Sequence, residues 1–152
     1  MKRNRNRFFI KLIAIILSFS LCTPIGVKAV EETTVQPRAS AYLAAYTAYI
    51  CAMGNGDLEI WFDITGTDYW ADIGVLSVLV YESTDNVNWH WVKTFLHDTT
   101  EGMLAHNNFC HMGHVDYKGV PGRYYKAYVC IWAGPEDTGD ARYMWTEVER
   151  CT

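Results

Sequence analysis

The sequence predicts an all-β protein, a seven-stranded antiparallel β-sandwich. Seven short segments rich in β-branched and aromatic residues follow one another at near-regular spacing. Nearly every glycine lies between these segments, where turns are expected, and helical periodicity never lasts longer than a turn or two. Short strands separated by regular turns are typical of sandwiches, so this architecture is the first expectation.

The first three strands are expected at 42–53, 58–64 and 75–81. The first is small and aromatic, and it ends at Gly54-Asn55-Gly56-Asp57, a strong hairpin signal. The second alternates strictly between apolar and polar positions, which indicates one face in the core and one in solvent. Residues 66–74 are irregular and acidic, so a loop is expected there. The third is a nearly continuous apolar run, which is typical of a strand buried on both faces.

The last four strands are expected at 89–95, 109–117, 124–133 and 142–149. Asp85-Asn86-Val87-Asn88 predicts the turn before the first of them, because Asp and Asn side chains bond their own backbone. A longer loop, 96–108, precedes the second. The third alternates between apolar and mixed side chains, and a polar turn at 134–140 separates it from the last.

The N-terminal residues predict secretion. Basic residues precede an apolar run at 8–21, and the small-residue site Val27-Lys28-Ala29 follows. This order predicts a signal peptide at 1–29, then an extended linker at 30–40 and a single β-sandwich domain at 41–152. The apolar run is shorter than the roughly 20 residues of a membrane span, so we expect no membrane anchor.

Charge argues against nucleic acid as a partner. Residues 1–29 hold six basic and no acidic side chains, so their removal takes the formal net charge from -4 to -10. Nucleic-acid binding needs a basic stripe that displaces counterions from phosphates, and an acidic chain lacks one.

The cysteines beyond the signal peptide are even in number, which in a secreted chain predicts disulfides. They are Cys51, Cys110, Cys130 and Cys151. If the strands run alternately up and down, Cys51 and Cys151 end at one pole of the sandwich, and Cys110 and Cys130 lie at the other. We therefore predict the bridges Cys110–Cys130 and Cys51–Cys151, subject to disulfide geometry.

Five short motifs follow one another along the chain. They are Gly54-Asn55-Gly56, Ile60-Trp61-Phe62-Asp63-Ile64-Thr65-Gly66-Thr67, Glu82-Ser83-Thr84-Asp85, Gly102-Met103-Leu104 and Gly122-Arg123-Tyr124-Tyr125-Lys126-Ala127-Tyr128-Val129. The ordered set resembles a family of small secreted proteins of Gram-positive bacteria with no established function. The resemblance implies a sandwich of immunoglobulin or fibronectin type III character, and it implies no catalytic residue, ligand or partner. Tyr125-x-Ala127-x-Val129 is similar to the sixth strand of fibronectin type III modules, in which an inward tyrosine bonds the backbone, so Tyr125 is expected to be structural.

Three histidines, His106, His111 and His114, raise the alternative of a zinc site. On a strand, His111 and His114 point to opposite faces, because their positions differ by an odd number. We therefore expect no bound metal and no other cofactor; if a site formed, these histidines would be its ligands, and binding would weaken below about pH 6.5. Neither G-x-S-x-G nor H-E-x-x-H occurs, so we expect no catalytic residue and no enzyme activity.

The surplus of aromatic residues is the best indication of function. Five of them are expected to point outward and to bind a ligand: Trp61, Trp89, Trp91, Tyr128 and Trp132. Outward Trp and Tyr form platforms for sugar stacking and for protein contacts. We therefore expect a secreted, non-catalytic recognition or adhesion module for an extracellular glycan or protein. A small secreted effector, such as a bacteriocin-like toxin or inhibitor, is the second hypothesis, and a metal-assisted hydrolase is the third.

Overall fold

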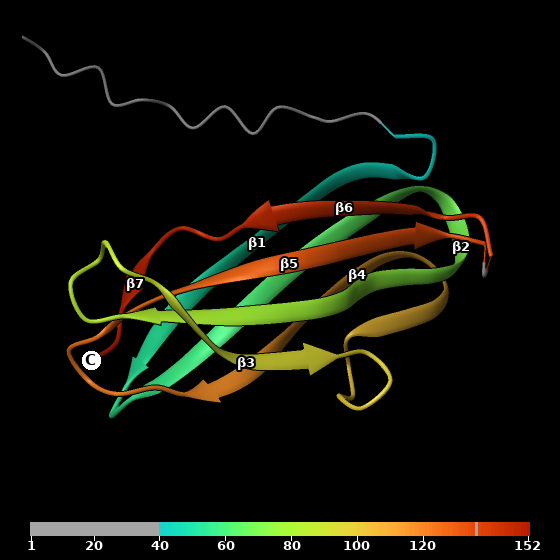
Figure 1. Cartoon of the computed structure of the whole chain (residues 1–152). Helices are drawn as coiled ribbons and strands as arrows, with labels where there is room; N and C mark the ends of the chain where they lie inside the picture. Colours follow the sequence, from blue (N-terminus) through green and yellow to red (C-terminus); the bar gives the residue numbers. More distant parts are fainter. Residues whose placement is uncertain (1–39, 136) are drawn as a thin grey trace, which may run out of the picture. The chain divides into compact units, whose positions relative to one another are not determined.

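The computed structural model describes residues 40–135 and 137–152, and these form one curled antiparallel sheet (Figure 1). Its strands are β1 (Leu43–Gly54), β2 (Asp57–Ser83), β3 (His90–Leu96), β4 (Leu104–Lys118), β5 (Tyr124–Gly134), β6 (Asp140–Trp145) and β7 (Glu149–Arg150). The predicted all-β, antiparallel, seven-stranded class is confirmed. The predicted signal peptide at 1–29, and all but the last residue of the linker at 30–40, lie outside the described residues. No helix in the described ranges is long and apolar enough to span a membrane.

The long strand β2 organises the sheet. Its first half pairs with β1 on one side and β4 on the other, and its second half pairs with β3 and β5. The loop expected at 66–74 is therefore wrong, because the chain bends there without leaving the strand. Gly74 makes the bend possible: its φ is +150°, and a Cβ at this position would lie 2.2 Å from the carbonyl oxygen of Met103.

The predicted strands at 58–64 and 75–81 are joined in β2, whereas the predicted strand at 142–149 is divided into β6 and β7. The number of strands therefore remains seven. The Oγ1 of Thr146 accepts a hydrogen bond from the backbone N–H of Ala127 at 2.9 Å. This side chain takes the place of a backbone carbonyl in the ladder, and β6 ends at the preceding residue. Strand β4 in turn begins earlier than expected, at Leu104 instead of Phe109, because its start pairs with the bend of β2.

The core lies on the inner face of the curl. The even-numbered residues from Leu58 to Ile64 are almost fully buried, as their alternation predicts, and so are Val78, Val80 and the inward residues of β5. Strand β1 also contacts β5, although the two strands are not hydrogen-bonded to each other. The half of the sheet that contains β1 and the half that contains β5 therefore enclose a common core. Burial of each such Ile or Phe stabilises the fold by about 1.5–3 kcal/mol. The residues of 75–81 are not all buried: Ser77, Leu79 and Tyr81 face outward and are half-buried.

Tyr125 fixes the turn between β4 and β5, as expected. Its side chain is fully buried, and its hydroxyl oxygen accepts a hydrogen bond from the backbone N–H of Val120 at 2.8 Å. The same hydroxyl donates to the carboxylate of Glu82, which also pairs with the guanidinium of Arg123. Burial, and then the hydrogen bond to Glu82, raise the pKa of Tyr125 far above its ordinary value.

The four described cysteines are free thiols, so neither predicted disulfide is formed. Cys51 is on the outer face of β1, whereas Cys151 is buried in the core, so the β1 backbone lies between their side chains. Cys110 belongs to the strand that pairs with the first half of β2, and Cys130 lies opposite its second half. The prediction assumed strands that alternate between two poles, and the continuous β2 removes that arrangement.

Candidate functional site

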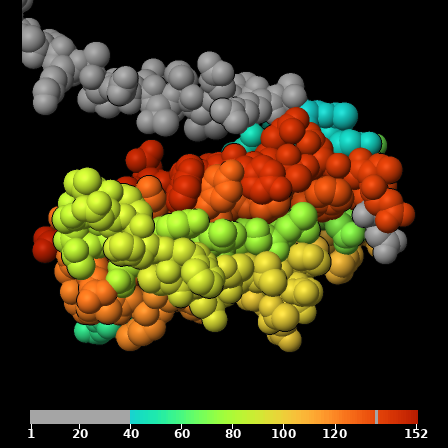
Figure 2. Space-filling model, viewed as in Figure 1, coloured from blue at the N-terminus to red at the C-terminus, as the bar shows by residue number. Residues whose placement is uncertain are grey.

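The outer face of β2, β5 and β6 carries a continuous layer of aromatic side chains. In Figure 1, the second half of β2 lies with β3, β5 and β6 in front of β1 and β4, and Figure 2 shows the side chains of this front layer from the same direction. We define the aromatic face as Tyr81, Tyr128, Tyr143 and Trp145 on these strands, together with Lys126 of β5 and with Trp89 from the turn before β3, which Lys126 contacts. The inner residues of β2 and β5 are fully buried in the core, and Met144 of β6 packs against that core while partly buried, so the sheet supports this face from within.

Trp145 is the centre of the aromatic face. Its ring centroid lies 4.8 Å from that of Tyr128 and 5.2 Å from that of Tyr81. Tyr128 in turn stacks on Tyr143 at 5.7 Å with an interplanar angle of 16°. These separations fall in the range in which aromatic pairs attract one another beyond simple burial. Trp145 is 47% exposed and Tyr143 is 54% exposed, so the layer is held together and still accessible.

Lys126 is the only cation in the aromatic face. Its Nζ lies 4.3 Å from the ring centroid of Trp89 and 4.6 Å from that of Trp145, which is within cation–π distance of both. The ammonium group therefore links the turn before β3 to β6 across the outer surface.

The structure divides the five predicted ligand-binding residues between two surfaces. Trp89 and Tyr128 belong to the aromatic face. Trp91, 60% exposed, lies on β3 beside it, opposite Tyr81, and its indole N–H donates to the Oγ1 of Thr94 at 3.0 Å. Trp132 points to the same side of β5 and is half-buried, with its indole packed close to Gly139. Trp61 lies elsewhere, on the first half of β2.

Trp61 is the centre of a second, smaller group on the outer face of β1, β2 and β4. Its indole is parallel to the ring of Tyr49, with centroids 6.4 Å apart, and it lies 4.5 Å from the imidazole of His114. Its N–H donates to the Oε2 of Glu59 at 2.8 Å. Trp61 is thus fixed by neighbours on three strands and does not extend the aromatic face.

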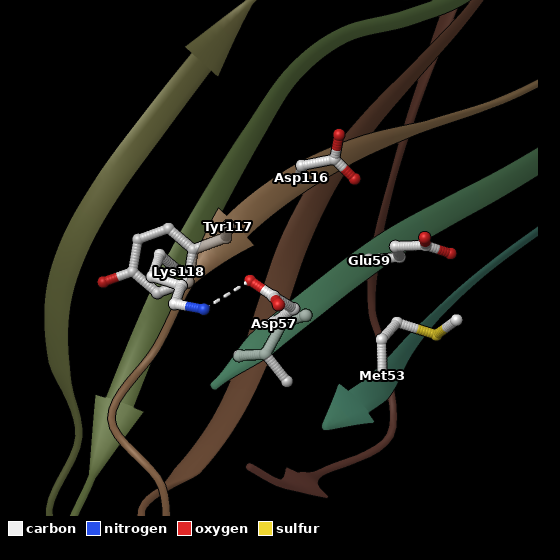
Figure 3. Close-up of a pocket in the computed structure, with 7 residues that line it drawn as sticks. Met53, Asp57, Glu59, Asp116, Tyr117 and Lys118 are labelled. Carbon is white, nitrogen blue, oxygen red and sulfur yellow. Dashed lines mark hydrogen bonds and ion pairs between the residues drawn. The ribbon is translucent and has the colours of Figure 1, made fainter. Parts of the chain in front are cut away.

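Glu59, His114 and Asp116 form what we call the acid–imidazole cluster. One ligand atom from each lies within 4.8 Å of the others, and the His114 Nε2 is 3.6 Å from the Asp116 Oδ1. Both carboxylates line a surface pocket of about 550 Å³, which also includes the ion pair between Lys118 and Asp57 (Figure 3).

The other predicted metal ligands are held apart. The His106 Nδ1 lies 2.5 Å from a carboxylate oxygen of Asp72. The ring of His111 packs against Phe62 on the inner side, and its Nε2 lies 2.7 Å from the carbonyl oxygen of Gly102. His111 and His114 thus point to opposite faces, as the spacing predicts, and no single set of ligands contains His106, His111 and His114.

Sequence reasoning missed Tyr81, Tyr143 and Trp145. Tyr81 was hidden in a run expected to be buried on both faces. The other two alternate on the last strand, and this spacing was the available signal. Their place in the aromatic face depends on the register between β5 and β6, which sets Trp145 opposite Tyr128. Only the structure shows that register.

No family model, curated protein sequence or solved structure matches the chain.

Proposed function

We propose that the chain is a secreted, non-catalytic recognition module that binds an extracellular glycan through its aromatic face. The observation that carries this proposal is that four rings form a continuous row across three strands. Tyr81 contacts Trp145, Trp145 contacts Tyr128, and Tyr128 contacts Tyr143. Tyr and Trp bury large areas and carry a polar group, so they suit the mixed surface of a sugar ring. Because these rings already hold one another, little side-chain entropy is lost on binding.

We also infer that the curled sheet is a sandwich of immunoglobulin or fibronectin type III character. The corner formed by Tyr125 and the Val120 N–H supports this, because such a tyrosine is a hallmark of these sandwiches. The resemblance to small secreted proteins of Gram-positive bacteria agrees with it. Secretion rests on the signal pattern of residues 1–29.

A glycan array with the purified protein and two variants tests the proposal. Trp145→Ala removes the centre of the aromatic face, and we expect retention of glycan to fall by about 30-fold or more, as for a central aromatic anchor. Trp61→Ala is the matched control, because it removes an indole from the other outer face. Far-UV circular dichroism of both variants verifies that the fold is kept.

Two results would contradict the proposal. If Trp61→Ala abolishes retention and Trp145→Ala does not, the binding surface lies on β1, β2 and β4. If the array shows no glycan, and the protein instead captures a protein from the culture medium in a Trp145-dependent way, the aromatic face is a protein-binding surface and the glycan assignment is wrong.

A further inference from the structure

The first half of β2 and the facing part of β4 form a ladder of outward side-chain pairs. These pairs are Asp57 with Lys118, Glu59 with Asp116, and Trp61 with His114. The Lys118 ammonium donates to Asp57 at 2.8 Å, which leaves Glu59 facing a second carboxylate. Like charges directly opposite each other destabilise a sheet. Within the described ranges, neither Glu59 nor Asp116 is paired with a lysine or arginine, so this pair lacks a compensating cation.

His114 adds a nitrogen donor to the two carboxylates. The ligand atoms of Glu59, His114 and Asp116 lie within 4.8 Å of one another. Zinc binds imidazole nitrogen and carboxylate oxygen at about 2.0–2.2 Å, so two ligands of one ion lie at most about 4 Å apart. Ligands at tetrahedral angles lie about 3.3–3.6 Å apart, so the three donors must close by about an ångström or a little more to share one ion.

Trp61 restrains two of the three donors. Its N–H donates to the Oε2 of Glu59 at 2.8 Å, and its ring lies against the imidazole of His114. Partners that orient ligands in this way are a regular part of metal sites. The pocket lined by Glu59 and Asp116 provides space for the water molecules that complete a coordination shell (Figure 3).

We propose that Glu59, His114 and Asp116 bind one divalent transition-metal ion, and that Zn²⁺ fits the site best. An imidazole with two carboxylates suits zinc, whereas Ca²⁺ and Mg²⁺ take oxygen ligands. The ion supplies the positive charge that the Glu59–Asp116 pair lacks. The site lies on the opposite half of β2 from the aromatic face, so it is independent of the proposed glycan binding.

Isothermal titration of the untagged, chelator-treated protein with ZnCl₂ tests the site. We expect one ion per chain in the wild type and no measurable binding in His114→Ala. Glu59→Gln and Asp116→Asn keep the side-chain volume and remove one charge, and each is expected to weaken binding at least about tenfold. His97→Ala is the matched control, because His97 is an exposed histidine in a loop away from the cluster. Far-UV circular dichroism of each variant verifies folding.

Trp61→Phe distinguishes a built site from a chance group of surface residues. Phenylalanine keeps an aromatic ring beside His114 and deletes the N–H that orients Glu59, so zinc affinity should fall about 10- to 100-fold with unchanged stoichiometry. Absence of stoichiometric zinc binding in the wild type would overturn the proposal. Equal losses in His114→Ala and His97→Ala would do the same, as would Ca²⁺ binding that is tighter than zinc binding and insensitive to His114→Ala.

Discussion

Replacing Tyr125 by phenylalanine removes one oxygen from the buried corner and changes nothing else. That oxygen donates to the Glu82 carboxylate and accepts from the Val120 N–H at 2.8 Å. A hydrogen bond to a charged group contributes about 1.5–3 kcal/mol and a neutral one about 0.5–1.5 kcal/mol. Val120 is 45% exposed, so water can replace part of the second bond. We therefore expect a loss of about 2–3 kcal/mol in the free energy of unfolding, and a fall in Tm on the order of 10 °C.

Urea and thermal unfolding followed by far-UV circular dichroism measure this loss. Tyr124→Phe is the matched control: it is the same substitution at the preceding residue of β5, on the opposite face, where the ring lies 5.8 Å from the Arg150 guanidinium. We expect Tyr124→Phe to change Tm by no more than about 2 °C, since surface substitutions stay within about 0.5 kcal/mol. Equal shifts in the two variants would refute the structural role of the Tyr125 hydroxyl.

The pH dependence of Tyr125→Phe gives an independent reading of the same corner. The pKa of Tyr125 is raised in the folded protein, so the neutral phenol is favoured there, while the unfolded chain begins to ionise near pH 10. The stabilisation is therefore complete below pH 10 and is lost as pH rises toward the folded pKa. The stability difference between wild type and Tyr125→Phe should narrow from pH 9 to pH 11, and a constant difference would contradict the assignment.

Two further predictions concern the turn before β3 and the thiols. The backbone N–H of Asn88, followed by its side chain and the Val87 N–H, lowers the pKa of Asp85. Asp85→Ala should therefore lower Tm at pH 7. The difference in Tm between wild type and variant should be smaller at pH 3, where the carboxyl is already largely protonated in the unfolded chain, and an equal difference at both pH values would count against this turn. Burial raises the pKa of the Cys151 thiol. Iodoacetamide at pH 8 should therefore alkylate half-buried Cys51 well before Cys151 in the folded protein, and mass spectrometry of timed samples measures the two rates. Comparable rates would place Cys151 outside the core.

Local patterns predicted the parts of this fold that depend on neighbours in the chain. The alternation of 58–64 assigns each side chain to the correct face. The turn after β1 follows from Asn55 and Gly56, which both adopt the positive φ that a tight hairpin requires. The turn before β3 follows from Asp85, whose Oδ1 accepts the Val87 and Asn88 N–H groups. In each case the determining contact spans three residues or fewer.

Features that depend on contacts between residues far apart in the chain could not be predicted from local patterns. Residues 66–74 have the composition of a loop, yet the indole N–H of Trp70 donates to the carbonyl oxygen of Tyr42 at 2.9 Å and holds the bend of β2 against the start of the described chain. The acid–imidazole cluster could not be predicted from the sequence either. His114 and Asp116 are two residues apart and visibly share a face, but Glu59 joins them only through the register of β2 with β4.

The composition of the aromatic face depends on one irregularity in β2. The pairing of β2 with β5 shifts by one residue between Val75 and Ser77. With this bulge, Val78 and Val80 enter the core, and Leu79 and Tyr81 face outward, where Tyr81 contacts Trp145. Without it, the period of two would continue from Val75 and send Leu79 and Tyr81 inward. Both alternatives bury apolar side chains, so hydrophobicity does not choose between them. The apolar run at 75–81 therefore resembles a strand buried on both faces, and the bulge is what places Tyr81 in the aromatic face, in contact with Trp145.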